Sequence, residues 1–365
     1  MSPRWRKALV LALKLGVAVV LLWLVLRKVQ WEDFTQTVNG REVAYRGFCS
    51  TVASADWRLL ALSVAAFLAP LFMLSVRWWY LLRIQQIHIS FIESVRLTLL
   101  GQFFSYVLPG TVSGDVVKAY YVSRHTDRKA AALVSVFVDR AVGLLEFALL
   151  PAAVMAVMAA AGADLSSMRW PAAVVGVVLL AVAGGMGVLL SPRLRAMLRL
   201  GRLLSFGRLR QHVEVAAEAA NLYRRRIGAL LKTLGITFGG QAFFITGVML
   251  AGLSLHLPVP WHQYFLYVPL IYIVAAVPIS PGGWGVAEIS FGLCFRRFFP
   301  DPEAAASPLL ALALVARLIP MLLSLPGLAV ALRGPRMPSA EMQASGFGLG
   351  ASGPAPDAQD SQAQA

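Results

Sequence analysis

Residues 108–115 read LPGTVSGD and residues 280–288 read SPGGWGVAE, and these two stretches decide how the chain folds. Each one interrupts an apolar segment with Pro-Gly, adds further glycines and then places a carboxylate, Asp115 or Glu288. Proline and glycine end or kink helices, and irregular backbone at membrane depth persists only where protein or a water-filled cavity covers it. A carboxylate beside such a break is costly in hydrocarbon, and it therefore marks a candidate functional site.

The composition around these breaks is that of an integral membrane protein. Hydrophobic residues make up 58% of the 365 residues, charged residues make up 14%, and the mean hydropathy is +0.69. A soluble domain of this length exposes far more polar surface. The formal net charge of +15 comes from Lys and Arg that cluster beside the apolar runs. This placement favours anionic lipid headgroups as partners over nucleic acid.

Six apolar runs approach or exceed the roughly 20 residues that cross a bilayer as a helix. We expect full spans at residues 8–26, 59–82, 131–158, 171–190, 233–255 and 306–332. The segments 91–121 and 264–297 are apolar but broken. The first run resembles a signal peptide, but its length and the absence of a small-x-small cleavage site indicate an uncleaved span. The predicted fold class is an all-α polytopic membrane protein.

The positive-inside rule sets the orientation of the first broken segment. Basic residues near the N-terminus place it in the cytoplasm, and Arg83 and the basic cluster at 118–129 then fall on the same side. We therefore predict a re-entrant hairpin that enters from the cytoplasm, breaks at Pro109-Gly110 and returns. The loop 27–58 is external in this topology, although it carries five basic residues.

The second broken segment has the opposite orientation under the same rule. It begins outside, breaks at Pro281-Gly282-Gly283 and ends before an acidic loop at 300–303. Two oppositely oriented hairpins, each flanked by two spans, are the plan of an inverted-topology repeat. The two halves share little sequence beyond the breaks, so the repeat is a hypothesis.

The remaining regions complete the predicted organisation of the chain. Residues 1–336 form one transmembrane domain, and residues 193–232 within it form a basic cytoplasmic segment. Residues 337–365 are rich in Gly, Ala, Ser, Pro and Gln, which predicts a disordered cytoplasmic tail. Both termini are thus expected in the cytoplasm of a bacterium whose inner membrane holds the protein.

Several charged residues lie inside the apolar segments, where an unpaired charge costs about 2.5–3.5 kcal/mol at a helix centre. Arg77 and Lys118 either lie near the interface and extend to headgroups or are buried. Asp139 and Arg140 lie farther from a helix end, and pairing with other helices is one interpretation for them. Glu288 and Arg317 are expected to pair or to line a polar cavity. An arginine there can bind a lipid phosphate through two hydrogen bonds.

Sequence signatures of other protein classes are missing. The chain has no Walker loop, dinucleotide fingerprint or Gly-x-Ser-x-Gly. Its two cysteines and five histidines form no metal-binding spacing. We therefore expect no catalytic residues, metal or cofactor.

Taken together, the motifs resemble the lysylphosphatidylglycerol synthase transmembrane family, a flippase-like domain. The shared motifs are Pro109-Gly110 with Gly114-Asp115, the Asp139-Arg140 pair, Pro281-Gly282-Gly283-x-Gly-x-x-Glu288, and Arg317. The resemblance covers roughly residues 8–333. In two-domain relatives the membrane domain moves aminoacylated phosphatidylglycerol between leaflets, while a soluble domain makes it. Because the chain ends in the predicted tail, the resemblance implies lipid handling without aminoacyl-transferase activity.

Our first hypothesis is therefore translocation of an anionic phospholipid or related amphiphile between leaflets. The predicted substrate-binding residues are Pro109, Gly110, Gly114, Asp115, Asp139, Arg140, Pro281, Gly282, Gly283, Glu288 and Arg317. The alternative is a non-transporting accessory or scaffold subunit of an envelope-lipid biosynthesis enzyme. Such an enzyme or a second copy of the chain would then be the protein partner. A third hypothesis, an intramembrane lipid-modifying enzyme, lacks a recognisable catalytic set.

Overall fold

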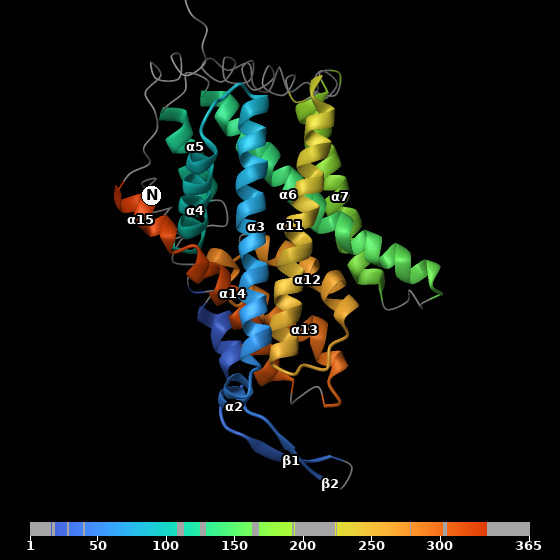
Figure 1. The fold of residues 1–365 in the computed structure, drawn as a ribbon. Helices are drawn as coiled ribbons and strands as arrows, with labels where there is room; N and C mark the ends of the chain where they lie inside the picture. Colours follow the sequence, from blue (N-terminus) through green and yellow to red (C-terminus); the bar gives the residue numbers. More distant parts are fainter. Residues whose placement is uncertain are drawn as a thin grey trace, which may run out of the picture.

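The computed structural model describes most of the chain and is almost entirely helical there (Figure 1). The described residues are 19–27, 29–38, 41–107, 113–124, 129–162, 168–191, 225–277, 279–301 and 305–333, with Gly16, Arg193 and Tyr223. The helices are α2 (Phe48–Ala53), α3 (Trp57–Ile84), α4 (Phe91–Val107), α5 (Ser113–Arg124), α6 (Lys129–Ala160), α7 (Arg169–Leu190), α11 (Ile227–Ser254), α12 (Trp261–Ala276), α13 (Val286–Phe295), α14 (Ala306–Leu323) and α15 (Pro326–Arg333). Two 3-10 turns, η2 (Pro281–Gly283) and η3 (Arg296–Phe298), flank α13.

Five helical stretches in the described ranges are long and apolar enough to cross a membrane. They are Trp57–Ile84, Val134–Ala160, Arg169–Val188, Ile227–Ser254 and Ala306–Arg333. These stretches coincide with five of the predicted spans, so the prediction of an all-α polytopic membrane protein is confirmed. The predicted first span lies mostly outside the described residues, as do the tail and most of the basic segment.

The core of the bundle is the antiparallel pair α3 and α11. The start of α3 meets the end of α11, where the Asp56 amide donates to the Ser254 carbonyl at 2.9 Å. Farther along, the Ser63 hydroxyl donates to the Gly247 carbonyl at 2.7 Å. A Cβ at Gly247 would lie 3.1 Å from the ring of Phe67, so glycine brings the two helices close together. Close approach at small residues is how membrane helices gain packing energy.

The first broken segment forms two helices, α4 and α5, that lie side by side (Figure 1). Their contact depends on two glycines. A Cβ at Gly114 would lie 1.8 Å from the Gly101 carbonyl oxygen, and a Cβ at Gly101 would lie 2.8 Å from the Lys118 side chain. The break itself, with Pro109 and Gly110, lies outside the described residues.

The second broken segment consists of α12, η2 and α13. Its turn needs glycine at three positions, because Gly282, Gly283 and Gly285 have φ angles of 61°, 69° and 80°. These left-handed conformations are disfavoured for residues with a Cβ. At Gly283 a Cβ would also lie 2.8 Å from the Ala275 carbonyl oxygen. The glycines therefore fold α13 back toward α12.

The two broken segments pack at opposite ends of the α3–α11 pair. In α4, Ser94 donates to the Ser75 carbonyl in the second half of α3, at 2.9 Å. In α12, Tyr264 packs against Gly252, near the end of α11 and hence near the start of α3. Figure 1 shows α4 and α5 beside the upper half of α3, and α12 and α13 beside its lower half. Entry from opposite membrane faces agrees with this arrangement and stays a prediction.

The predicted external loop 27–58 contains secondary structure that the sequence analysis did not anticipate. Strands β1 (Phe34–Val38) and β2 (Arg41–Tyr45) pair antiparallel, with Phe34 opposite Tyr45. Their rings stack with centroids 5.5 Å apart. The short helix α2 follows and joins this hairpin to α3 (Figure 1).

The close packing of α4 on α5 predicts a large effect of one methyl group. Gly114→Ala is expected to lower the free energy of unfolding by about 1–3 kcal/mol, because overpacking forces the helices apart. The matched control is Gly176→Ala in α7, where a Cβ would have no neighbour within 4 Å. Thermal unfolding of the purified variants in detergent measures both. Equal stability of the two variants would contradict the packing described for α4 and α5.

Candidate functional site

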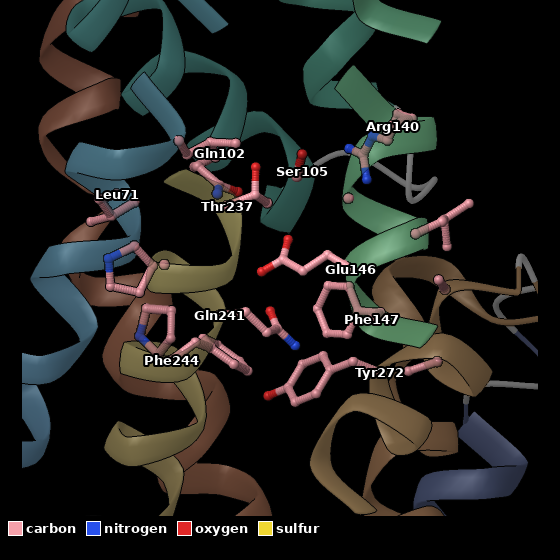
Figure 2. Close-up of a pocket in the computed structure, with 18 of the residues that line it drawn as sticks. Leu71, Gln102, Ser105, Arg140, Glu146, Phe147, Thr237, Gln241, Phe244 and Tyr272 are labelled. Atoms are coloured by element: carbon pink, nitrogen blue, oxygen red, sulfur yellow. The ribbon is translucent and has the colours of Figure 1, made fainter. Parts of the chain in front are cut away.

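A cavity of about 410 Å³ lies where the two broken segments meet the long helices. The side chains that line it come from α3, α4, α5, α6, α11, α12, α13 and α14, and Gly282 of η2 reaches it as well. Figure 2 shows polar side chains from several of these helices around this space, among them Gln102, Ser105, Glu146, Thr237 and Gln241. The cavity thus has a largely apolar wall that carries several polar and charged side chains.

The structure brings five of the eleven predicted site residues to this cavity. Those that line it are Asp115, Asp139, Arg140, Gly282 and Arg317. Glu288 is 3% exposed and is not among the lining residues, but it pairs with Arg317, which lines the cavity. Gly114 packs against α4, and Pro281 and Gly283 belong to η2. Pro109 and Gly110 lie outside the described residues, so their predicted contribution is not tested.

Asp115 is the centre of the first charged cluster. It lies in the first turn of α5, where the helix dipole favours a negative charge. Its carboxylate accepts from Lys118 Nζ at 3.3 Å and from Arg140 Nε of α6. Lys118 Nζ also lies 4.8 Å from the ring centroid of Trp78. The Arg140 side chain is 46% exposed, so this cluster places a partly accessible guanidinium on the cavity wall.

Arg77 and Asp139 form a second, buried pair. Arg77 Nε donates to Asp139 Oδ1 at 2.7 Å, and its Nη1 lies 3.5 Å from Thr237 Oγ1. Asp139 and Arg140 are neighbours in sequence but have different partners, because consecutive residues point about 100° apart around a helix. The pairs therefore tie α6 to α3 through one residue and to α5 through the next.

Arg317 joins the second broken segment to the last predicted span. Its Nε donates to Glu288 Oε1 at 2.9 Å, while Nη1 and Nη2 donate to the Gly282 and Gly283 carbonyls at 2.8 and 3.1 Å. The guanidinium also lies 4.4 Å from the ring centroid of Trp284. Glu288 and Arg317 were expected to pair or to line a polar cavity. They pair with each other, and Arg317 also lines the cavity.

Glu288 also caps the start of α13, where it is the third residue of the helix. Its Oε2 accepts from the amide of Gly285, the N-cap residue, at 2.7 Å. The position suits a carboxylate, because the positive end of the helix dipole favours a negative charge.

Sequence reasoning assigned some residues incompletely. Of the two interpretations of Arg77 and Lys118, burial is the one the structure shows, because their side chains are only 8% and 4% exposed. Glu146 and Gln241 were not chosen as site residues, yet both line the cavity. A signal was available, because a carboxylate or an amide inside an apolar span is unusual.

The family of this chain follows from a match along most of its length. A family model described as the lysylphosphatidylglycerol synthase TM region matches residues 11–327. The chain belongs to this family. The match includes every element that lines the cavity, and it confirms the resemblance found in the motifs. No curated protein matches the sequence.

Membership in this family and the membrane spans make the chain a lipid-related integral membrane protein. In the described part of the chain, no group of three or more His, Cys, Asp or Glu side chains is arranged to hold a metal ion. The described side chains of the cavity offer charged groups and hydrogen-bond donors and acceptors.

The Arg317–Glu288 pair predicts an asymmetric effect of mutation. Arg317→Ala is expected to destabilise the protein by about 3–5 kcal/mol, because it leaves the buried Glu288 carboxylate without its cation. Adding Glu288→Gln should restore part of this loss by removing the orphaned charge. A double-mutant cycle of thermal unfolding in detergent measures the coupling. Strict additivity of the two single variants would show that the pair does not contribute as described.

Proposed function

We propose that this lysylphosphatidylglycerol synthase TM-region protein moves the headgroup of an anionic phospholipid, or a related amphiphile, between membrane leaflets. The observation that carries the proposal is the single cavity lined by both broken segments and by four basic side chains. A lipid headgroup needs a polar path through a membrane, and broken helices with charged walls supply one.

The four basic residues of the cavity differ in how accessible their side chains are to the phosphate of an incoming headgroup. Arg77 and Arg317 already donate to carboxylate or carbonyl oxygens and are nearly buried. Arg140 is the most exposed of the four, because its side chain is 46% exposed. We assign the first contact with the headgroup phosphate to Arg140, since charge-assisted bonds to phosphate are strong.

The proposal includes the location and the limits of the activity. The protein is placed in a bacterial inner membrane with both termini in the cytoplasm, in line with its basic residues near span ends. Membrane lipids are its proposed partners. Aminoacyl transfer is not part of the proposed activity, since the matched family model is a transmembrane region.

Arg140→Ala is the variant that tests the proposal. It should slow translocation of fluorescent phosphatidylglycerol in proteoliposomes by about tenfold or more, because hydrogen bonds to charged groups contribute about 1.5–3 kcal/mol. The matched control is Arg96→Ala. Arg96 also has a side chain that is 46% exposed and pairs with a carboxylate, but it is not among the residues that line the cavity.

The measurement is the fraction of label that dithionite bleaches from outside over time. The proposal expects wild type and Arg96→Ala to move label at similar rates, well above protein-free liposomes. If wild type moves no more label than empty liposomes, the translocase function is wrong. If Arg140→Ala equals wild type, the assigned role of Arg140 is wrong.

A further inference from the structure

One buried carboxylate in the cavity has no salt-bridge partner among the residues that the structure describes. Glu146 lies near the middle of α6, is 2% exposed and lines the cavity. Its Oε1 accepts no hydrogen bond. Among the described residues it forms no ion pair, in contrast to Asp115, Asp139 and Glu288. Figure 2 shows its carboxylate directed into the space between α6 and α11.

Two hydroxyl groups that line the cavity donate to the backbone of their own helices. The Thr237 hydroxyl donates to the Thr233 carbonyl at 2.6 Å, and the Ser105 hydroxyl donates to the Gly101 carbonyl at 2.9 Å. A hydroxyl has a single hydrogen to donate. Gln241 Nε2 is also buried and donates no hydrogen bond in the structure. The cavity therefore contains one unused donor, Gln241 Nε2, as well as one unused acceptor, Glu146 Oε1.

The charged and titratable groups around Glu146 come from seven of the eight helices that form the cavity. They are Arg77 of α3, Tyr106 of α4, Asp115 and Lys118 of α5, Asp139 and Arg140 of α6, Tyr272 of α12, Glu288 of α13 and Arg317 of α14. Arg77 is close enough to attract Glu146 electrostatically, but its Nε is bound to Asp139. The neighbouring α11 adds the uncharged Thr237 and Gln241.

The charge balance of the cavity depends on Glu146 alone. The lining residues together with Glu288 comprise four basic and four acidic side chains, so the site is neutral when all are ionised. Three of the four carboxylates are held by a cation. If a proton neutralises Glu146, the site carries one net positive charge, and an anionic headgroup then meets a cavity of opposite sign.

We propose that Glu146 is the proton-binding site of the cavity, and that a proton at Glu146 and an anionic lipid headgroup bind together. The inference rests on the proposed lipid function. A proton from water binds to one Glu146 oxygen as the headgroup enters, forming an O–H bond and cancelling the carboxylate charge. The same proton returns to water when the headgroup leaves. Binding of each ligand strengthens binding of the other by the same factor, as linkage requires.

The first experiment detects the proton without any lipid probe. Infrared difference spectra of the purified full-length protein between acidic and alkaline pH should contain the carbonyl stretch of a protonated carboxyl group. This band is expected to disappear in Glu146→Gln. It should persist in Glu93→Gln, since Glu93 is also 2% exposed with an Oε1 that lacks a hydrogen bond, and is not among the residues lining the cavity. Identical spectra of wild type and Glu146→Gln would overturn the proton site.

The second experiment measures linkage with a short-chain fluorescent phosphatidylglycerol as the probe. Wild-type affinity should fall by about 5–150-fold from acidic to alkaline pH, the range typical of coupled sites. Glu146→Gln resembles the protonated form and should keep the acidic-side affinity throughout, whereas Glu93→Gln should behave as wild type. Wild-type binding that does not change with pH would overturn the linkage. A wild type that binds the probe at no pH would refute the proposed lipid function, while the infrared band still decides the proton site.

Discussion

A broken helix inside a membrane leaves carbonyl groups without hydrogen-bond partners, and here the guanidinium of Arg317 satisfies them. It binds the Gly282 and Gly283 carbonyls and the Glu288 carboxylate at once. Unsatisfied carbonyls at this depth would each cost several kcal/mol. The left-handed glycines that make the turn therefore depend on an arginine from another helix, and Glu288 compensates the buried positive charge of that arginine.

The same constraint organises the other half of the molecule. Asp115 holds Lys118 and Arg140 beside the first break, and Asp139 holds Arg77 of the central α3. Each ion pair either joins two helices or lies in the first turn of one helix. The charged residues therefore hold the helices that form the cavity wall and also supply the charged groups of the cavity. Glu146 is the exception among these carboxylates, since it pairs with none of the described cations, and we therefore place the proposed proton on it.

The features that follow from local chemistry could be predicted from the sequence. Hydropathy and length place the spans, and Pro-Gly with nearby carboxylates marks the breaks. Glu288 and Arg317 stand out because an unpaired charge at such positions is too costly to persist. The hairpin in loop 27–58 also had a sequence signal, since an Asn-Gly pair between two short runs that contain β-branched residues favours a tight turn.

The features that depend on tertiary packing could not be predicted. The distance of Arg77 and Lys118 from a span end can be counted in the sequence. Their pairing with Asp139 and Asp115 depends on how the helices are turned and packed, which the sequence does not reveal. For the same reason, the sequence alone does not distinguish Glu146 from the other charged residues inside the apolar segments. Its significance comes from its tertiary surroundings, since its Oε1 is buried without a hydrogen bond and none of the described cations forms a salt bridge with it.

The central claim is that two broken segments enter from opposite faces and share one cavity, and accessibility labelling tests it most directly. Single cysteines replace Ser90 and His125 around the first segment, or Trp261 and Pro300 around the second, after Cys49 and Cys294 are changed to serine. An impermeant maleimide applied to intact cells and to inverted vesicles reports the side of each. The account predicts that 90 and 125 label only from the cytoplasm and that 261 and 300 label only from outside. Labelling of the two ends of either segment from opposite faces would contradict it.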